Sequence, residues 1–439
     1  MMDRMPTGRT IATRTAAALA AVTLLALLAV PAASASRPEP CNGSSALCDR
    51  PFDQVTLPGS HNAMSNAELG WSKPNQEYSM TGQLERGSRA MLIDTYYGRK
   101  VGGGLVEKVE PADRDQPGVD LYLCHSICQW GSVELVEELG RVRSFLAAHP
   151  REAMVLVNES YVTPEDFAGA VERSGLIDFV YRGPTDRWPT LGEMAASGQR
   201  VVMLSEGGTG DVPWYHPAYD GILRETPYSF PAMDGGTDLL TNPASLDETC
   251  RPNRGGDAGS LFLMNHWVSG NDTEVVTPDP AAAAVVNQKD AVVARARACE
   301  RRRGVKPTVL AVDFFGAGDV VGAARELNGV TAQPFLQVKR PARRAVRAGR
   351  KARYRVAIAN LGDAAAAPAR VCATVPKRLA RKPRCAKVKV PPGGSAAARV
   401  AVPTKKRARG RGTVRFTVRA TGNLLRTSAK LRVKPRRGR

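Results

Sequence analysis

Between about residue 53 and residue 330, short apolar runs alternate with longer stretches of helical periodicity. The runs are apolar at consecutive positions, which is typical of strands buried on both faces. Because helical stretches separate them, the strands are expected to lie parallel in one sheet. The clearest runs are 55–57, 90–93, 121–123, 154–157, 201–204, 261–264 and 309–312, and 179–181 is a candidate for one more.

The intervening stretches carry helix signals. Apolar residues recur at helical spacing after Ser132, a candidate N-cap, and Pro164 follows Thr163 as in many helix starts. The helices are expected over 132–148, 164–174 and 280–297. Parallel strands with helices between them, in a segment of this length, predict an α/β fold of the TIM-type (β/α) barrel class. An open doubly wound sheet is the alternative, which the lack of G-x-G-x-x-G after the first run disfavours. Residues 207–259 are rich in Gly, Pro, Asp and Thr and are expected to form an irregular excursion.

The pattern changes after Pro334. Apolar residues now alternate with polar ones in short runs, separated by turn residues such as Pro391-Pro392-Gly393-Gly394. The runs are 335–338, 354–358, 371–375, 388–390, 400–402, 414–418 and 431–433. About seven strands in roughly a hundred residues is typical of an immunoglobulin-like sandwich. We therefore expect a barrel over residues 36–335 and a small all-β domain over residues 336–439.

The formal net charge of +20 is unevenly distributed. Residues 336–439 contain 32 Lys and Arg residues and one acid, Asp363, whereas the first 335 residues contain 30 basic and 41 acidic residues. A basic domain joined to an acidic body indicates two modules with different partners. Anionic wall polymer, acidic lipid or polysaccharide would suit the basic module, and a merely solvated face is the alternative. Specific binding of nucleic acid is disfavoured, since few aromatic residues lie between the cations.

Residues 1–35 have the features of a secretory signal peptide. Basic residues precede a largely apolar stretch over 16–30, and Ala33-Ser34-Ala35 fits a cleavage site. A membrane anchor is the alternative, but the apolar stretch is short for a span of about 20 residues. The protein is therefore expected to be secreted, either free or associated with the cell surface.

Eight cysteines fit an oxidising compartment. They lie in local pairs, although their order alone does not prove connectivity: Cys41 with Cys48, Cys124 with Cys128, Cys250 with Cys299, and Cys372 with Cys385. A zinc site is the alternative, which the C-x6-C and C-x3-C spacings and the expected export disfavour.

Polar or ionisable residues follow nearly every apolar run. They are His61, Asn62, Asp94, His125, Asn158, Glu159, Ser205, Glu206, Asn265, His266 and Asp313. Catalytic residues of a (β/α) barrel come from the carboxyl ends of its strands, where these residues would lie. Any one of them could be an ordinary turn residue, because turns favour Asn and Asp. Together they would bring three of the five histidines to one face; His149 and His216 are expected to lie elsewhere.

Two of these histidines suit general acid–base chemistry on a phosphodiester. His61 would remove a proton from the nucleophile and His125 would give one to the leaving alkoxide, roles that an imidazole can fill near neutral pH. The transition state gains negative charge and needs a nearby cation. Asn62, Asp94 and Glu159 offer the hard oxygen ligands that Ca²⁺ prefers, and hydrogen-bonded turn residues are the alternative.

Several segments carry a family resemblance. They are PGSHNAMS, QLERGSRAMLIDTYYG, LYLCHSICQWGSVELVEELGRVRSFLAAHPREAMVLVNESY and TVLAVDFFG. In order and spacing, residues 53–330 resemble the X-domain phosphatidylinositol-specific phospholipase C superfamily, and most closely its secreted, cysteine-bearing branch. The C-terminal module is similar to a bacterial Ig-like repeat of the CARDB type.

The resemblance implies a TIM-type barrel and in-line attack of the inositol 2-hydroxyl on phosphorus. It assigns the base to His61, the acid to His125 and an orienting carboxylate to Asp313. It places Asn62, Asp94 and Glu159 at calcium-ligand positions, and we assign Asn62 and Asn265 to phosphate binding. Two departures stand out: Leu92 replaces an acid of the calcium-dependent members, and residues 95–97 lack the arginine of the metal-independent ones.

The sequence therefore predicts a secreted phosphodiesterase that cleaves phosphatidylinositol-like lipids at a membrane surface, with Ca²⁺ as its cofactor and acting as a monomer. The alternative is a catalytically silent barrel whose basic domain attaches to anionic wall or membrane material. A glycerophosphodiester substrate ranks lower, since His-Asn-Ala follows the first run where His-Arg-Gly would be expected.

Overall fold

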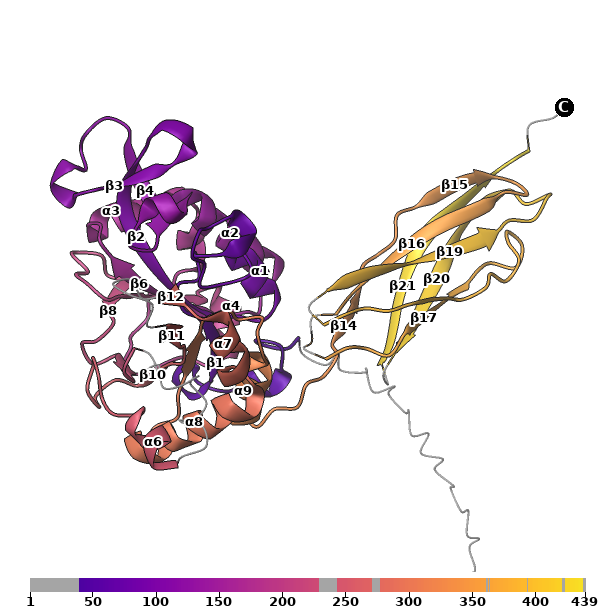
Figure 1. Cartoon of the computed structure of the whole chain (residues 1–439). Helices are drawn as coiled ribbons and strands as arrows, with labels where there is room; N and C mark the ends of the chain where they lie inside the picture. Colours follow the sequence, from indigo (N-terminus) through magenta and orange to yellow (C-terminus); the bar gives the residue numbers. More distant parts are fainter. Residues whose placement is uncertain are drawn as a thin grey trace, which may run out of the picture. The chain divides into compact units, whose positions relative to one another are not determined.

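The computed structural model describes residues 39–228, 243–270, 277–360, 362, 364–392, 394–420 and 423–436 (Figure 1). The expected signal peptide, residues 1–35, lies outside the described residues. The described chain has an α/β part, with strands between residues 57 and 312, and an all-β part from residue 336 onward. Among the described strands, none of one part pairs with a strand of the other.

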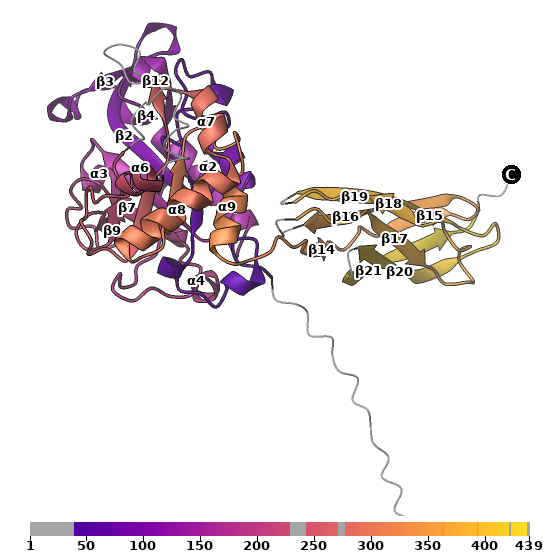
Figure 2. The same ribbon diagram turned by 60° about the horizontal axis from the view of Figure 1, so that its bottom comes forward.

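The α/β part is built on parallel strands that form one curled sheet (Figure 1 and Figure 2). The strand order is β8-β7-β6-β2-β1-β13-β10-β9, and each neighbouring pair on this path is parallel. In the described chain the end strands β8 and β9 do not pair with each other, so the sheet is a half-barrel and a fully closed barrel is not confirmed. The strands are β1 (Leu57–Ser60), β2 (Ala90–Lys100), β6 (Met154–Ser160), β7 (Val201–Ser205), β8 (Tyr215–Pro217), β9 (Leu223–Glu225), β10 (Leu261–Asn265) and β13 (Val309–Val312).

Both faces of this sheet are buried, which explains the continuous apolar runs. Alternate residues of a strand face opposite sides. On β2, Ala90 and Leu92 pack in the interior cluster, whereas Met91 and Ile93 belong to the cluster that contains the apolar faces of α2 (Leu135–Ala148) and α3 (Pro164–Arg173). On β13, Val309 and Ala311 face the interior, whereas Leu310 and Val312 pack with α8 (Lys289–Arg303) and α9 (Val320–Leu327).

One expected barrel strand is not part of the parallel path. The run 121–123 lies in β4 (Val119–Cys124), which pairs antiparallel with the distal half of β2. β2 has 11 residues, so it continues past the sheet edge into an antiparallel arm. The arm also contains β3 (Val106–Val109) and β5 (Ser132–Glu134). Apolar character alone cannot distinguish an arm strand from a barrel strand, because both are buried.

The segment over 207–259 was expected to be an irregular excursion, and this prediction is wrong for part of it. It supplies the edge strands β8 and β9, whose Tyr215 and Leu223 are fully buried. Each of these strands has three residues, too few to leave an apolar run in the sequence. The run 179–181 makes only a single parallel bridge, Val180 with Val201.

Helix positions agree with expectation except at two places. Ser132 lies in β5 and does not cap α2, which begins at Leu135. The helix expected over 280–297 is two helices, α7 (Pro280–Val286) and α8, because the backbone of Gln288 is extended. At the break, the Asn287 side chain donates to the main-chain carbonyl of Asp313 at 2.7 Å. No helix among the described residues is long and apolar enough to cross a membrane. Other elements are α1 (Met80–Glu85), α4 (Leu191–Ser197), α6 (Pro243–Glu248), β11 (Ser269–Gly270) and β12 (Thr277–Pro278).

The all-β part is a sandwich of two sheets with one core. All the expected strands are present; β15, a strand of mostly exposed residues, was not expected. Tyr354 of one sheet and Phe416 of the other meet edge-to-face, with ring centroids 5.2 Å apart. One sheet has the order β14 (Leu336–Val338), β16 (Lys351–Asn360), β19 (Ser395–Pro403); the other has the order β15 (Arg344–Arg347), β21 (Asn423–Lys434), β20 (Gly410–Ala420), β17 (Ala369–Thr374), β18 (Ala386–Val388).

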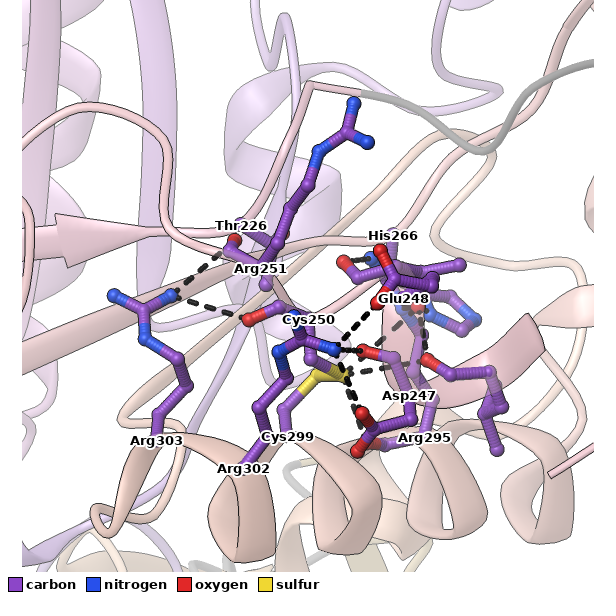
Figure 3. The surroundings of a disulfide bond; sticks show 12 residues. Thr226, Asp247, Glu248, Cys250, Arg251, His266, Arg295, Cys299, Arg302 and Arg303 are labelled. Carbon is purple, nitrogen blue, oxygen red and sulfur yellow. Dashed lines mark hydrogen bonds and ion pairs between the residues drawn. A yellow bond between two sulfur atoms is a disulfide. The ribbon is translucent and has the colours of Figure 1, made fainter. Parts of the chain in front are cut away.

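The four expected cysteine pairs are all disulfides. Figure 3 shows the surroundings of Cys250–Cys299, which ties the segment after α6 to α8. Beside it, Arg302 forms an ion pair of 2.7 Å with Asp247, and the buried Arg295 donates to the Thr249 carbonyl at 3.1 Å. This disulfide therefore lies within a cross-linked contact between α6 and α8.

Replacing Cys250 and Cys299 together with alanine is expected to lower the free energy of unfolding by about 4 kcal/mol, because the unfolded chain loses a long closed loop. The pair spans 49 residues, against 7 for Cys41–Cys48. Removing the short loop should cost only about 2 kcal/mol. Denaturant unfolding followed by tryptophan fluorescence measures both costs, and equal costs would contradict this ordering.

Candidate active site

The inward-facing row of every parallel strand except β8 ends in a polar residue at the carboxyl edge of the sheet. On β2 the inward residues are Ala90, Leu92 and then Asp94, and on β13 they are Val309, Ala311 and then Asp313. An apolar interior is thus covered by a ring of polar side chains. We call this set the carboxyl-edge ring: His61, Asp94, Glu159, Glu206, Glu225, Asn265 and Asp313.

His61 and Asp313 form a hydrogen-bonded pair in this ring. The register sets Gly59 opposite Ala311, so the next inward residues of the two strands lie side by side. His61 Nδ1 is 2.8 Å from Asp313 Oδ1. The Asp313 side chain is 1% exposed, and both of its oxygens lie 3.2 Å from Asn75 Nδ2. Asp313 therefore orients the imidazole so that Nε2, on the opposite edge of the ring, is the atom available for proton transfer.

The His61 ring is also held by stacking. It lies on the indole of Trp267, with ring centroids 3.7 Å apart and planes inclined by 2°. Below it, a side chain at Gly59 would be crowded, because a Cβ there would lie 3.0 Å from Ala90 Cβ and 3.2 Å from the Leu310 carbonyl. The carboxylate, the indole and the tight strand packing together fix the position of the imidazole.

His125 reaches the same edge from the antiparallel arm. β4 runs back toward the sheet with Leu123 opposite Thr95, so its end arrives beside the position of Asp94. His125 Nε2 lies 3.2 Å from Asn62 Nδ2, which connects the two strand ends. Burial, and then the nearby His61, lowers the pKa of His125 to about 4. His125 is therefore neutral at pH 7 in the unliganded protein, with a Nε2 lone pair accepting from Asn62.

Asp94 is a buried carboxylate beside other acids. It is 5% exposed, it is in register with Glu159 on β6, and it has no hydrogen-bond or ion-pair partner in the described part of the chain. Burial, and then the charges of Glu159 and Glu206, raise the pKa of Asp94 well above its usual value. Such a carboxylate favours a bound cation or a proton.

The fit to calcium is partial. Asn62 follows β1, the strand beside β2, but Glu159 on β6 is exposed and hydrogen-bonded by the Tyr161 hydroxyl. Leu92, where the resemblance leads one to expect another acid, is 8% exposed and packs in the interior cluster. Within the described ranges, no group of three or more His, Cys, Asp or Glu side chains is arranged to hold a metal ion.

A guanidinium that the sequence did not indicate lies in the carboxyl-edge ring, away from the histidine pair. Arg254 forms ion pairs with Glu206 at 2.6 Å and with Glu225 at 2.7 Å, and the Tyr219 hydroxyl joins the cluster. Arg254 and Glu225 come from the segment expected to be irregular, so no strand pattern pointed to them. Asn75 and Trp267 also lacked a sequence signal, since each lies in a loop.

Asn265 and His266 are in place but do not face the histidine pair. Asn265 Nδ2 donates to the Thr226 carbonyl at 2.9 Å and to Glu225 at 3.2 Å, which leaves this amide no hydrogen for a phosphate. His266 is fully buried, with Nε2 2.9 Å from the Val286 carbonyl, and its pKa is lowered to about 3 by burial and by Arg295. Of the expected site residues, the structure thus brings together His61, Asn62, His125 and Asp313, with Asp94 and Glu159 beside them.

Comparison with known proteins identifies the family. The family model PI-PLC X 1 matches residues 108–328, half of the chain. The chain belongs to the PI-PLC X domain family. The matched part contains His125, Glu159 and Asp313 and begins after His61, Asn62 and Asp94.

Individual relatives extend this likeness. The chain is 28% identical over 323 residues to PI-PLC X domain-containing protein 1 of Arthroderma benhamiae, covering 70% of this chain and 95% of that protein. It is 28% identical over 316 residues to a protein of the same fungus named "Uncharacterized secreted protein", covering 66% of this chain and 64% of the relative.

Among solved structures, the chain matches the CARDB domain of a Pyrococcus furiosus protein. The match has 15% identity, covers 24% of this chain and 96% of that chain, and has a TM-score of 0.19.

Replacing Asp94 with asparagine is expected to stabilise the cation-free protein at pH 7. The pKa of Asp94 is raised in the folded state. The contribution of this carboxyl group to the free energy of unfolding is therefore fully present at low pH and is lost as the pH rises through the raised pKa. The uncharged amide avoids this loss, because no charge is then buried beside Glu159 and Glu206. Thermal unfolding at pH 4 and pH 7, with chelator present, tests this. A variant no more stable than the wild type at pH 7 would contradict it.

Proposed function

We propose that this PI-PLC X domain is an active phosphodiesterase that cleaves phosphatidylinositol-like lipids with His61 as general base and His125 as general acid. The observation that carries the proposal is the joining of the two strand ends: His61 is held by Asp313, and His125 approaches Asn62, the residue next to His61. A silent domain would not require a buried carboxylate behind one of the two histidines.

In the proposed reaction the inositol 2-hydroxyl oxygen attacks phosphorus while the bond from phosphorus to the diacylglycerol oxygen breaks. The hydroxyl proton passes to His61 Nε2, and Asp313 stabilises the imidazolium that forms. A proton from His125 Nε2 neutralises the leaving alkoxide. The products are a cyclic inositol phosphate and diacylglycerol, and both histidines then return to their starting states by exchanging protons with water.

The acid requires a substrate-induced change at His125. Its pKa of about 4 in the unliganded protein leaves Nε2 without a proton at neutral pH. A phosphodiester anion close to the ring would favour the imidazolium and raise this pKa. Bound substrate would also replace the Asn62 amide as the partner of Nε2, so that Asn62 could donate to a phosphate oxygen instead.

The charge at the site calls for a cation, which we propose to be Ca²⁺ held by Asn62, Asp94 and Glu159. The carboxyl-edge ring carries five carboxylates, and Arg254 is bound between only two of them. An anionic substrate would be repelled unless positive charge compensated Asp94 and Glu159. When bound, Ca²⁺ would stabilise the negative charge that develops on the phosphate oxygens.

Export is part of the proposal. Four disulfides and a relative named as secreted agree with an extracellular location. The second candidate function is that of a silent surface-binding protein, which one observation favours: the sandwich has a dense basic surface with no acid among its described residues. Measuring the turnover of phosphatidylinositol distinguishes the phosphodiesterase from the silent surface-binding protein.

Replacing His61 or His125 with alanine should each lower the rate of cyclic phosphate release from phosphatidylinositol by roughly 10²–10⁴-fold, because each removes a proton-transfer group. The matched control is His149→Gln. His149 lies at the end of α2, stacked on Phe145, away from the ring, and its replacement should leave the rate unchanged. Circular dichroism verifies that the variants fold. Activity indifferent to both active-site substitutions would refute the assigned roles, and a wild type without turnover would favour the silent alternative.

Calcium is expected to raise both the turnover rate and the melting temperature of the wild type. It should raise neither in the Asp94→Asn variant, because that variant has lost a charged ligand. The matched control is Glu137→Gln on the surface of α2, whose side chain is 58% exposed. A calcium titration followed by thermal unfolding and by product release measures both effects. Turnover that persists in the presence of chelator would show that calcium is not required. The acidic residues would then act only by orienting neighbouring side chains.

A further inference from the structure

The sandwich has cations without acidic neighbours of its own. Asp363 is the single acid in the sequence of residues 336–439, and no Asp or Glu occurs among the residues of that range that the structure describes. Folded domains normally mix both signs on their surfaces. The self-repulsion of such a surface is relieved when an anionic partner binds.

The cations are arranged in a continuous row on one sheet face. β20 and β21 pair antiparallel, and alternate residues of each face outward. Every outward pair of this ladder contributes at least one cation. The pairs are Arg411 with Arg432, Thr413 with Lys430, Arg415 with Ser428, Thr417 with Arg426, and Arg419 with Leu424. We call Arg411, Arg415, Arg419, Arg426, Lys430 and Arg432 the cationic row; all six are exposed.

The spacing of the row suits a linear chain of charges. Successive outward pairs are two residues apart along the strands, which is about 6.8 Å. The row continues sideways at one end, because Arg370 on β17 lies opposite Arg419 and Lys387 on β18 lies opposite Arg370. Figure 1 and Figure 2 show β21, β20 and β17 side by side.

The residues between the cations are small and hydroxylated. At the three central pairs a cation is opposite Ser428, Thr413 or Thr417, and Lys430 Nζ lies 3.4 Å from Thr413 Oγ1. A phosphate group presents several acceptor oxygens, which an adjacent cation and hydroxyl can bind together. Each of the three central pairs thus provides one cation and one hydroxyl for one phosphate group.

A flexible polymer fits this face better than a bilayer. Adjacent strands are rotated by roughly 20–25°, so the outward face of a five-stranded sheet is strongly twisted and a flat membrane would contact only part of it. Peripheral membrane binding also uses exposed apolar side chains. Leu424 is the only exposed large hydrophobic residue among the described residues of the sandwich.

We propose that the cationic row binds a linear polymer carrying one phosphate per repeat. The polymer lies along β20 and β21, its phosphates bound in turn by the outward pairs. This attachment is independent of the chemistry at the carboxyl-edge ring and would retain the enzyme at a surface rich in such polymer.

The opposite sheet provides a matched control. Its outward cations, Lys351, Arg353, Arg355 and Arg399, occupy only part of the β16–β19 ladder, and the remaining outward positions include Ala357, Ala359, Ala397 and Ser395. They occupy three consecutive outward pairs, against five in the cationic row. Replacing these four cations removes the same charge as replacing four members of the cationic row.

The test uses the full chain and poly(glycerol phosphate) as the probe. Arg415→Thr, Arg419→Thr, Arg426→Thr and Arg432→Thr combined should weaken binding by roughly tenfold or more and reduce its dependence on salt. Lys351→Thr, Arg353→Thr, Arg355→Thr and Arg399→Thr combined should weaken it by less than about threefold, since only long-range attraction is lost. Threonine is a good strand former, so both variants should fold, which thermal unfolding verifies.

Three results would overturn the proposal. Equal losses in the two variants would show that net charge, and not the row, governs binding. Tighter binding to polygalacturonate, which carries carboxylates, would exclude the match to phosphate. Tighter binding to vesicles containing phosphatidylglycerol would identify a membrane and not a polymer as the partner.

Discussion

The site depends on one constraint, the parallel register of β1 with β13. In a parallel pair, opposite residues face the same side, so the pairing of Gly59 with Ala311 sets His61 beside Asp313 although 252 residues separate them. A slip of one residue would turn either side chain toward the helices. Close packing helps to hold the register, since a side chain at Gly59 of β1 would crowd Ala90 and Leu310. A residue of small size therefore contributes to where the His61 imidazole lies.

The sequence predicted the parallel strands and most site residues because both leave local signals. A buried strand is an apolar run, and the residue that ends its inward row follows directly, as Asp94 and Asp313 do. The features that the sequence did not reveal leave no such local signal. Arg254 and Trp267 act through loops whose paths are set by tertiary packing. β8 and β9 are too short to form a pattern, and β4 is apolar like a barrel strand but runs the opposite way.

Charge is divided between the two parts of the chain in a way that suits their separate tasks. The acidic ring has more carboxylates than its own guanidinium can compensate, which favours a bound cation. The sandwich has the opposite excess and favours a polyanion. In the proposed function, the chain combines a site that must overcome repulsion of its substrate with a domain that concentrates the protein near anionic material.

The two histidines belong to different parts of the fold. His61 is embedded in the parallel sheet, whereas His125 lies at the end of an antiparallel arm that extends past the sheet edge and is closed locally by Cys124–Cys128. Arms of this kind exchange their amide hydrogens through local openings that leave the core intact. On heating, the distance between His61 and His125 should become variable while the sheet is still folded. The proposed activity would then be lost before the core melts, and its temperature limit would be a property of the arm.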